Sequence, residues 1–339
     1  MTKIYRLDPN RVEENNPLDI LAEIIEPEIN LVNQIILKET ENRVSLIPKL
    51  ASHIISSGGK RLRPMLTIAS AKLCQYSGNR HIRLAACVEF IHTATLLHDD
   101  VVDSSNLRRG VKSANTVWGN ESSILVGDYL FSRAFQLMVS DGSIKVLKVL
   151  SDTSAIIAQG EVHQLLTKND LDTSEDTYLD VVEAKTAALF SAACKVGGIV
   201  ADRKITDQNS LESYGKNLGI AFQLIDDALD YSATSSKLGK SRGDDFKEGK
   251  ITIPVILAYR RGDSEERSFW QKTLVSCKQN QNDFDHAVML MNKHNSIRDT
   301  IKRAKHYGDK AKDALAIFPN DRIKEILINL VDYCIKRDK

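Results

Sequence analysis

The sequence predicts an all-α protein of about ten or more helices, and two observations support this. Of the seven prolines, five lie at or before Pro64 and the next is Pro254, so 189 consecutive residues contain none. Long helices exclude proline, whereas sheet proteins need the frequent turns that it marks. Apolar residues also recur at three- and four-residue steps over 85–102, 124–139 and 181–200. That spacing is typical of amphipathic helices.

Connections between the helices are predicted at breaks that contain glycine or serine, near Gly58, Gly78, Gly110, Gly142 and Ser235. Strictly alternating strand patterns are nearly absent. The chain contains no repeat, low-complexity tract or linker that would divide it. We therefore expect 1–339 to form a single domain.

Composition limits the class of protein. Lys plus Arg is 46 against 45 for Asp plus Glu, so the overall charge favours no nucleic-acid partner. The five cysteines form no CxxC pair, which fits a reducing cytoplasm better than a disulfide framework or a zinc site. No segment approaches the roughly 20 apolar residues of a membrane span. We expect a cytoplasmic protein, which leaves open a peripheral contact with a membrane surface.

The stretch LLHDDVVDSSNLRRG contains the first of two acidic clusters. Asp99 and Asp103 are four residues apart and should share one face of a helix, with Asp100 to one side. Like charges at this spacing destabilise a helix. The aspartates could pair with Arg108 and Arg109 in an ordinary salt-bridged surface, or they could bind outside partners.

The stretch GIAFQLIDDALDY repeats the DDxxD spacing with Asp226, Asp227 and Asp230. Both clusters are embedded in apolar residues, which argues against a solvated helix edge. Mg²⁺ prefers carboxylate oxygens and usually completes its shell with water and substrate phosphates. The doubled pattern therefore predicts a Mg²⁺-dependent anchor for a polyphosphate, and it favours outside partners over pairing with the nearby arginines.

Three basic runs supply the opposite charge. Arg108 and Arg109 follow the first acidic cluster, GKSRGDDFKEGK follows the second, and SSGGKRLRP lies upstream. The planar guanidinium of arginine suits bidentate binding of phosphate. Because Arg61 follows Lys60, the spacing of a nucleotide-binding phosphate loop is absent. The three runs predict two anionic groups bound side by side.

Taken together, GGKRLRP, LLHDDVVDSSNLRRG, VGDYLFSRAF, AQGE, KTAALF, GIAFQLIDDALD and GKSRGDDFKEGKITIP resemble the trans-isoprenyl diphosphate synthases, and most closely their long-chain polyprenyl branch. These motifs lie in the family's order within 58–254. The N-terminal helices of 1–57 and the C-terminal helices of 255–339 match in length and helical character only. The resemblance implies a bundle around a deep central cavity and a homodimer.

The resemblance also implies an activity. A Mg²⁺-dependent prenyltransferase would condense isopentenyl diphosphate repeatedly with an allylic primer, farnesyl or geranylgeranyl diphosphate. The product would be a long-chain all-trans polyprenyl diphosphate of the octaprenyl to decaprenyl type, destined for a quinone side chain.

Roles for individual residues follow from the same resemblance. The metal ligands would be Asp99, Asp100, Asp103, Asp226, Asp227 and Asp230. The allylic diphosphate would be bound by Arg108, Lys185, Lys240 and Lys250. The diphosphate of isopentenyl diphosphate would be bound by Lys60, Arg63, His92 and Arg109. The catalytic set would be Asp99, Asp103, Asp226, Lys185, Thr186 and Gln223, supported by Gln159, Glu161 and Asp245.

The length of the product should depend on residues about one turn before the first acidic cluster. Ala94 and Thr95 are small, whereas the resemblance implies a bulky aromatic near this position in short-product enzymes. Leu130, Phe131 and Phe135 would then form the floor of a tunnel for the growing chain. These three side chains could equally be ordinary core residues.

Four alternative functions share some of these features. The pair formed by His98 and Asp99 could indicate a metal phosphohydrolase, but the doubled DDxxD would stay unexplained. Terpene cyclases typically carry an Asn/Ser/Glu motif at the second site. A regulatory subunit of a heteromeric synthase usually lacks an acidic cluster or the basic motifs, and a shorter-chain synthase stays open. The segment from Arg261 onward shows no pattern that indicates chemistry.

Overall fold

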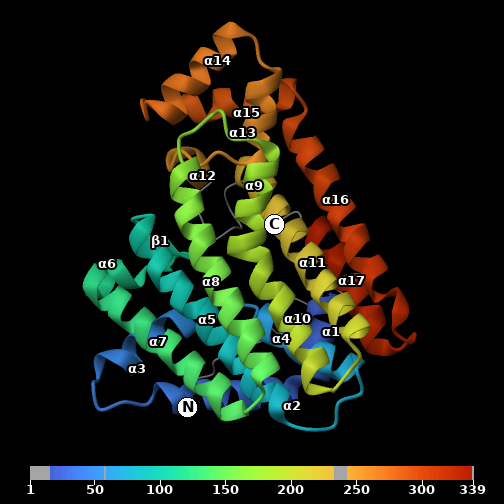
Figure 1. The fold of residues 1–339 in the computed structure, drawn as a ribbon. Coiled ribbons are helices and arrows are strands. Elements are labelled where there is room, and N and C mark those ends of the chain that lie inside the picture. Colours follow the sequence, from blue (N-terminus) through green and yellow to red (C-terminus); the bar gives the residue numbers. More distant parts are fainter. Residues whose placement is uncertain (1–15, 57–58, 233–242, 338–339) are drawn as a thin grey trace.

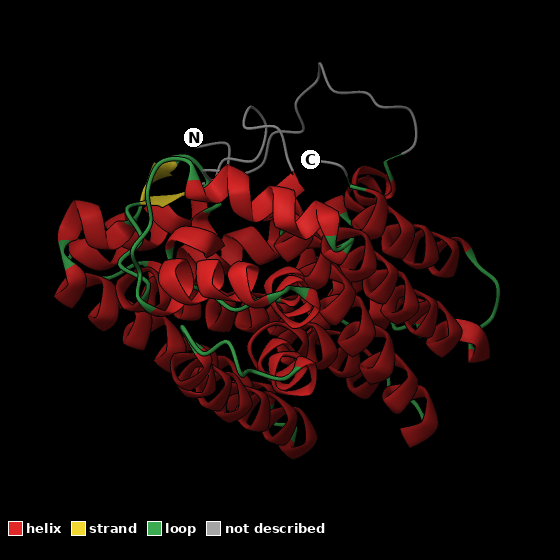
Figure 2. Ribbon diagram, turned by 90° about the horizontal axis from the view of Figure 1, so that it is seen from above, coloured by secondary structure: helices red, strands yellow, loops and turns green. Residues whose placement is uncertain are grey.

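The computed structural model describes residues 16–56, 59–232 and 243–337, and its regular structure is helical apart from one small hairpin (Figures 1 and 2). This confirms the all-α class. The α-helices are α1 (Pro17–Ile24), α2 (Glu26–Thr40), α3 (Leu46–Ser56), α4 (Leu62–Leu73), α5 (Arg80–Val102), α6 (Ala114–Trp118), α7 (Asn120–Asp141), α8 (Ile144–Thr167), α9 (Glu175–Val182), α10 (Ala188–Val200), α11 (Ile205–Ser232), α12 (Asp244–Lys247), α13 (Ile253–Arg261), α14 (Ser264–Trp270), α15 (Asp283–Lys293), α16 (Ser296–Ala314) and α17 (Arg322–Lys336). Shorter helical turns are η1 (Glu183–Ala187), η2 (Gln271–Val275) and η3 (Leu315–Ile317). Within these described segments, no helix is both long enough and apolar enough to cross a membrane.

Helix α5 lies inside the bundle because most of its faces are apolar. Small side chains such as Ala85 and Ala94 are fully buried, which lets α4, α7 and α10 pack closely around it. The helix predicted over 124–139 lies within α7. The helix predicted over 181–200 is divided by the π-helical turn η1, which separates α9 from α10.

The connection after α5 contains a hairpin that the sequence pattern did not indicate. Strands β1 (Leu107–Arg108) and β2 (Val111–Lys112) pair antiparallel. The turn between them consists of Arg109 and Gly110, with φ of 53° and 78°. Two successive positive φ angles are typical of the turn that best fits the twist of a two-residue hairpin. The hairpin therefore fixes both arginines close to the end of α5.

Turn η1 is packed between two glycines. A Cβ atom on Gly160 of α8 would lie 2.7 Å from the Ala184 Cβ, and one on Gly219 of α11 would lie 2.7 Å from the Ala187 Cα. Any larger residue at either position would push its helix away from η1. A π-helical turn holds one residue more than an α-helical turn, and such turns often occur at functional sites.

The C-terminal ends of α5 and α11 lie at the same end of the bundle. The segment after α11 joins them: Lys250 Nζ is 3.3 Å from Asp103 Oδ2, and the Asp245 backbone N–H donates to Asp230 Oδ2 at 3.2 Å. Helices α12 to α15 lie beyond this end, at the top of Figure 1. Buried apolar side chains form one core around α4, α5 and α10 and a second around α11 and α13.

Candidate active site

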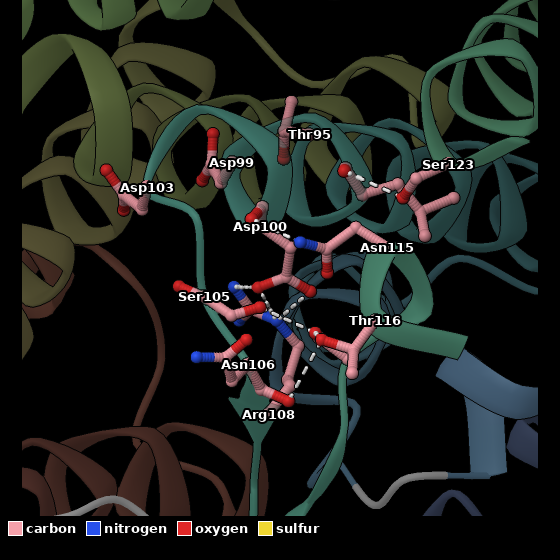
Figure 3. A network of polar contacts seen from close by, with 12 residues as sticks. Thr95, Asp99, Asp100, Asp103, Ser105, Asn106, Arg108, Asn115, Thr116 and Ser123 are labelled. Carbon is pink, nitrogen blue, oxygen red and sulfur yellow. Dashed lines mark hydrogen bonds and ion pairs between the residues drawn. The ribbon is translucent and has the colours of Figure 1, made fainter. Parts of the chain in front are cut away.

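The first acidic cluster presents two carboxylates on one side of α5. Thr95, Asp99 and Asp103 extend from the same side of the helix, whereas Asp100 extends from the other (Figure 3). The arrangement of Asp99 and Asp103 on one face, predicted from their spacing, is confirmed. Both carboxylates face lysines: Lys185 Nζ is 3.6 Å from Asp99 Oδ2, and Lys250 Nζ is 3.3 Å from Asp103 Oδ2.

Asp100 forms a buried ion pair with an arginine of the same chain, Arg108. Its side chain is 1% exposed, and the Nε and Nη2 atoms of Arg108 donate to its carboxylate at 2.6–2.8 Å (Figure 3). The expectation that both residues turn to outside partners is therefore wrong for this pair. The physical reason is that a carboxylate on the inner side of α5 is removed from water and needs a close cation.

The second acidic cluster also contains one buried aspartate and one more exposed aspartate. Asp227 is 3% exposed, and it accepts hydrogen bonds from the Tyr178 hydroxyl and, at 2.8 Å, from Gln223 Nε2. Burial and the negative charge of Asp245 raise the pKa of Asp227 to about 8. Asp226 is more open, with a 42% exposed side chain. The predicted metal role of Asp227 does not fit a carboxylate whose two oxygens are both taken within the protein.

The π-helical turn η1 places two of the predicted catalytic residues between the acidic clusters. Lys185 Nζ lies 2.7 Å from Glu161 Oε2 on α8, in addition to its contact with Asp99. Burial and the charge of Asp99 raise the pKa of Glu161 to about 7. The Thr186 hydroxyl donates to Gln223 Oε1 at 3.0 Å. The structure thus brings together two predicted catalytic residues, Thr186 and Gln223.

Lys250 lies in a pocket of carboxylates. Its Nζ is 2.6 Å from Glu248 Oε2, 3.3 Å from Asp103 Oδ2 and 3.9 Å from Asp245 Oδ1. Burial opposes its charge, but these carboxylates raise the pKa of Lys250 above its usual value. Lys240, which was predicted to act with it, lies outside the described residues.

A second group of cations lies next to the acidic clusters. Arg63 Nη1 is 3.1 Å from His92 Nε2, and the Arg63 guanidinium stacks 4.4 Å from the centre of the Phe190 ring. Burial, together with the positive charge of Arg109, lowers the pKa of Arg63 to about 10. Burial and the charges of Arg63 and Arg109 also lower the pKa of His92 well below its usual range. Such crowding of positive charge favours an anion.

Two further predicted residues complete this group. Arg109 lies against Gly59, where a Cβ atom would come within 2.6 Å of its Nη1 atom. Lys60, the next residue, donates from Nζ to the Tyr333 hydroxyl at 3.0 Å. Arg108 also adds positive charge around His92.

Of the residues predicted to support the catalytic set, Gln159 is exposed on α8.

The C-terminal helix contributes contacts that the sequence did not indicate. Arg337 Nη2 pairs with Asp226 Oδ1, and the guanidinium stacks 3.8 Å from the centre of the Phe222 ring. Tyr333, one turn earlier, contacts Lys60. The segment after Arg261, in which the sequence shows no pattern that indicates chemistry, thus reaches the site with its last turn. No spacing pattern could reveal a contact across 111 residues.

The predicted tunnel residues differ in position. Ala94 is fully buried in the core, whereas Thr95 is half-buried on the side of α5 that carries Asp99 (Figure 3). Phe131 is half-buried on α7, with its ring centre 5.7 Å from that of Phe135. Phe135 is 36% exposed. A side chain this open to solvent does not fit the floor of a closed tunnel within one chain.

The donor atoms at this end of the bundle suit a hard divalent cation. Asp99, Asp103 and Asp226 each face a side-chain cation, so a positive charge is favoured at all three. Across the described residues, no three His, Cys, Asp or Glu side chains converge closely enough to hold an ion by themselves.

The chain resembles known proteins in both sequence and fold. Residues 44–291 match the family model for polyprenyl synthetase. The chain is 43% identical to octaprenyl diphosphate synthase of Escherichia coli, over 95% of this chain and 99% of that protein. A decaprenyl diphosphate synthase from Rhodobacter capsulatus superposes with a TM-score of 0.92 at 48% identity, covering 95% of this chain and 100% of that one. A polyprenyl synthase from Caulobacter crescentus, complexed with calcium and isoprenyl diphosphate, superposes with a TM-score of 0.92 at 46% identity, covering 95% and 98%.

Proposed function

The chain belongs to the polyprenyl synthetase family and is a prenyltransferase, and on that premise we propose that it makes a long-chain all-trans polyprenyl diphosphate. It would condense isopentenyl diphosphate repeatedly with an allylic primer, farnesyl or geranylgeranyl diphosphate. The observation that carries this proposal is the arrangement of two acidic helix ends beside a separate group of cations. Such a site can hold two diphosphates, one through metal ions and one through cations alone.

Mg²⁺ fits the acidic side of the site. Asp99 on α5, Asp103 directly after it and Asp226 on α11 would hold it, with the allylic diphosphate completing the shell. When bound, the ions neutralise charge on the departing pyrophosphate. This assignment is supported by the Caulobacter crescentus enzyme, which was solved with calcium and isoprenyl diphosphate.

The protein's own side chains complete the proposed reaction. Lys185 and Lys250 would bind the allylic diphosphate, because both lie at the carboxylates that would hold the ions. Arg63 and Arg109 would bind the second diphosphate. Oxygen dipoles in fixed positions stabilise a developing cation. The hydroxyl of Thr186 and the amide oxygen of Gln223 supply such dipoles, while the apolar helices exclude water from the cation.

A long product is supported by the relatives and by the local geometry. Two of the three named relatives are an octaprenyl and a decaprenyl diphosphate synthase. Thr95, one turn before Asp99 on the same side of α5, is small enough to let a growing chain pass (Figure 3). A quinone side chain is the proposed destination of the product.

We also propose that the enzyme is a homodimer. Large apolar side chains on α7 and α8 are exposed, including Leu125 (67%), Val139 (65%), Val162 (61%) and Leu166 (74%). Exposed apolar residues gathered on neighbouring helices favour an interface. Sedimentation equilibrium would give twice the mass of the chain if this is correct.

A cytoplasmic location is proposed from the free cysteines Cys74, Cys87, Cys194, Cys277 and Cys334.

One assay tests the reaction and the product length together. The purified protein is incubated with Mg²⁺, radiolabelled isopentenyl diphosphate and farnesyl or geranylgeranyl diphosphate, and the products are separated by chromatography. We expect octaprenyl to decaprenyl products. A short product would contradict the long-chain assignment. No incorporation would favour the alternative, a regulatory subunit that needs a partner, although both acidic clusters and the basic motifs are present.

A further inference from the structure

Tyr178 makes a buried contact that the proposed reaction has not used. This residue of α9 is 6% exposed, and its hydroxyl donates to one carboxylate oxygen of Asp227. The other carboxylate oxygen of Asp227 accepts from Gln223 Nε2 at 2.8 Å. Asp227 is itself buried, so Tyr178 and Gln223 together satisfy its two oxygens away from water.

This arrangement decides which way the Gln223 amide points. With Nε2 held against the Asp227 carboxylate, Oε1 faces η1 and accepts from the Thr186 hydroxyl at 3.0 Å. Flipping the amide would place its oxygen against the carboxylate and its NH₂ group against the Thr186 hydroxyl. The flip would lose the hydrogen bond from Gln223 Nε2 to Asp227 and bring two oxygen atoms together, whereas the Thr186 hydroxyl could still accept from the amide, so the contact with Asp227 decides the orientation.

The position of Asp227 depends in turn on Tyr178. Without the tyrosine hydroxyl, one oxygen of a buried carboxylate has no donor, and that is unfavourable enough to drive a rotation of the side chain. A rotated carboxylate no longer holds Gln223 Nε2 in place. The contacts therefore run from Tyr178 through Asp227 and Gln223 to Thr186. Through them, the Tyr178 hydroxyl on α9 fixes the positions of the Gln223 amide oxygen and the Thr186 hydroxyl oxygen.

We propose that Tyr178 is a positioning residue that acts through Asp227 to hold the Gln223 amide oxygen toward the allylic carbon. Asp227 then serves to orient Gln223, not to bind Mg²⁺. The inference rests on the proposed function, because the oriented oxygen matters only if a cation develops beside it. A dipole fixed in advance stabilises such a cation more than one that must reorient.

The test is a double-mutant cycle with Tyr178→Phe and Gln223→Ala. Alone, Tyr178→Phe should lower kcat about tenfold, the effect of one hydrogen bond that acts in the transition state, and leave KM for isopentenyl diphosphate within about twofold. In the Gln223→Ala background, Tyr178→Phe should change kcat less than about twofold, because the group through which it acts is gone.

Tyr214→Phe is the matched control. Tyr214 is also fully buried, and its hydroxyl donates to the Leu327 carbonyl at 2.9 Å. This variant also loses one buried tyrosine hydroxyl, and it should keep kcat within about twofold. An equal loss from Tyr178→Phe in both backgrounds, or no loss in either, would overturn the proposal. If the unaltered protein forms no polyprenyl product, the proposed function has failed instead.

Asp227→Asn provides a second measurement. An asparagine can still accept from Gln223 Nε2, so this variant should be more active than Asp227→Ala. The Mg²⁺ concentration for half-maximal activity should stay within about twofold of that of the unaltered protein, because a residue that orients Gln223 does not bind the ion. A large increase in that concentration would show that Asp227 is a metal ligand and would overturn the proposal.

Discussion

The guanidinium of Arg337 on the last turn of the described chain pairs with the Asp226 carboxylate on α11. One oxygen of a proposed metal ligand is thus held by a cation of the protein itself. The same guanidinium stacks on Phe222 and donates to its carbonyl oxygen at 3.1 Å. Binding of Mg²⁺ at Asp226 must therefore compete with Arg337.

We expect Arg337→Gln to lower the Mg²⁺ concentration that gives half-maximal condensation. A partly exposed ion pair contributes up to about 1 kcal/mol, so the change should be about two- to fivefold. The measurement is the initial rate against Mg²⁺ concentration at saturating substrates. Lys336→Gln is the control, since Lys336 is a neighbouring exposed cation. An unchanged Mg²⁺ requirement in Arg337→Gln would contradict the competition.

The first two aspartates of LLHDDVVD should respond differently to substitution. Asp99→Ala should lower kcat about a thousandfold or more and change the free energy of unfolding by less than about 1 kcal/mol, because Lys185 keeps a second carboxylate partner, Glu161. Asp100→Ala should lower the free energy of unfolding by about 3 kcal/mol, because it leaves Arg108 without its buried partner. Urea unfolding and steady-state kinetics measure both quantities. If both variants lowered the free energy of unfolding equally, the buried pair of Asp100 and Arg108 would contribute no more to stability than Asp99 does.

Thr95→Tyr should shorten the product, because a bulky ring one turn before Asp99 blocks the proposed path of the chain. Chromatography of the products measures this. Val102→Tyr, at a 53% exposed position of the same helix, should leave product length unchanged. Ala94→Phe should instead lower the free energy of unfolding by about 1–3 kcal/mol, because Ala94 is fully buried and has no space for a ring. Unaltered product length in Thr95→Tyr would place the tunnel elsewhere.

His92 should make the protein less stable in acid. Its pKa is lowered in the folded state, so below its ordinary value of about 6.5 the unfolded chain binds a proton that the folded chain does not. Stability therefore falls as the pH falls through about 6.5, by at most about 1.4 kcal/mol per pH unit. Urea unfolding between pH 5 and pH 8 should show a smaller pH dependence for His92→Gln. His306→Gln, at an exposed position, should behave like the unaltered protein.

The parts of the site that lie along one helix were accessible from the sequence. Spacing alone placed Asp99 and Asp103 on one face, because the helical period is fixed. The same period left Asp100 to one side, but it could not say that this side is buried or that the β1–β2 hairpin brings Arg108 to it. Burial depends on which helices pack there, and a single sequence does not encode that in its local pattern.

Contacts between distant segments were missed for the same reason. Tyr178 precedes Lys185 by seven residues, but Lys185 lies within the π-helical turn Glu183–Ala187, which changes the helical phase, so an α-helical period could not relate the two side chains. The residues of that turn carry no local signature that would predict it. Arg337 offered no signal, because a basic residue at the end of an amphipathic helix usually faces water.

The extra residue in η1 has a genetic consequence. Most single-residue deletions within a helix rotate everything that follows by about 100° and ruin its packing. Deleting Ala184 would convert the wide turn into an ordinary one and leave α10 in phase with its neighbours. The fold would survive while Lys185 and Thr186 lost the directions that bring them to Asp99 and Gln223. Deletion of one codon would thus remove the site contacts of η1 and leave the helical fold in place.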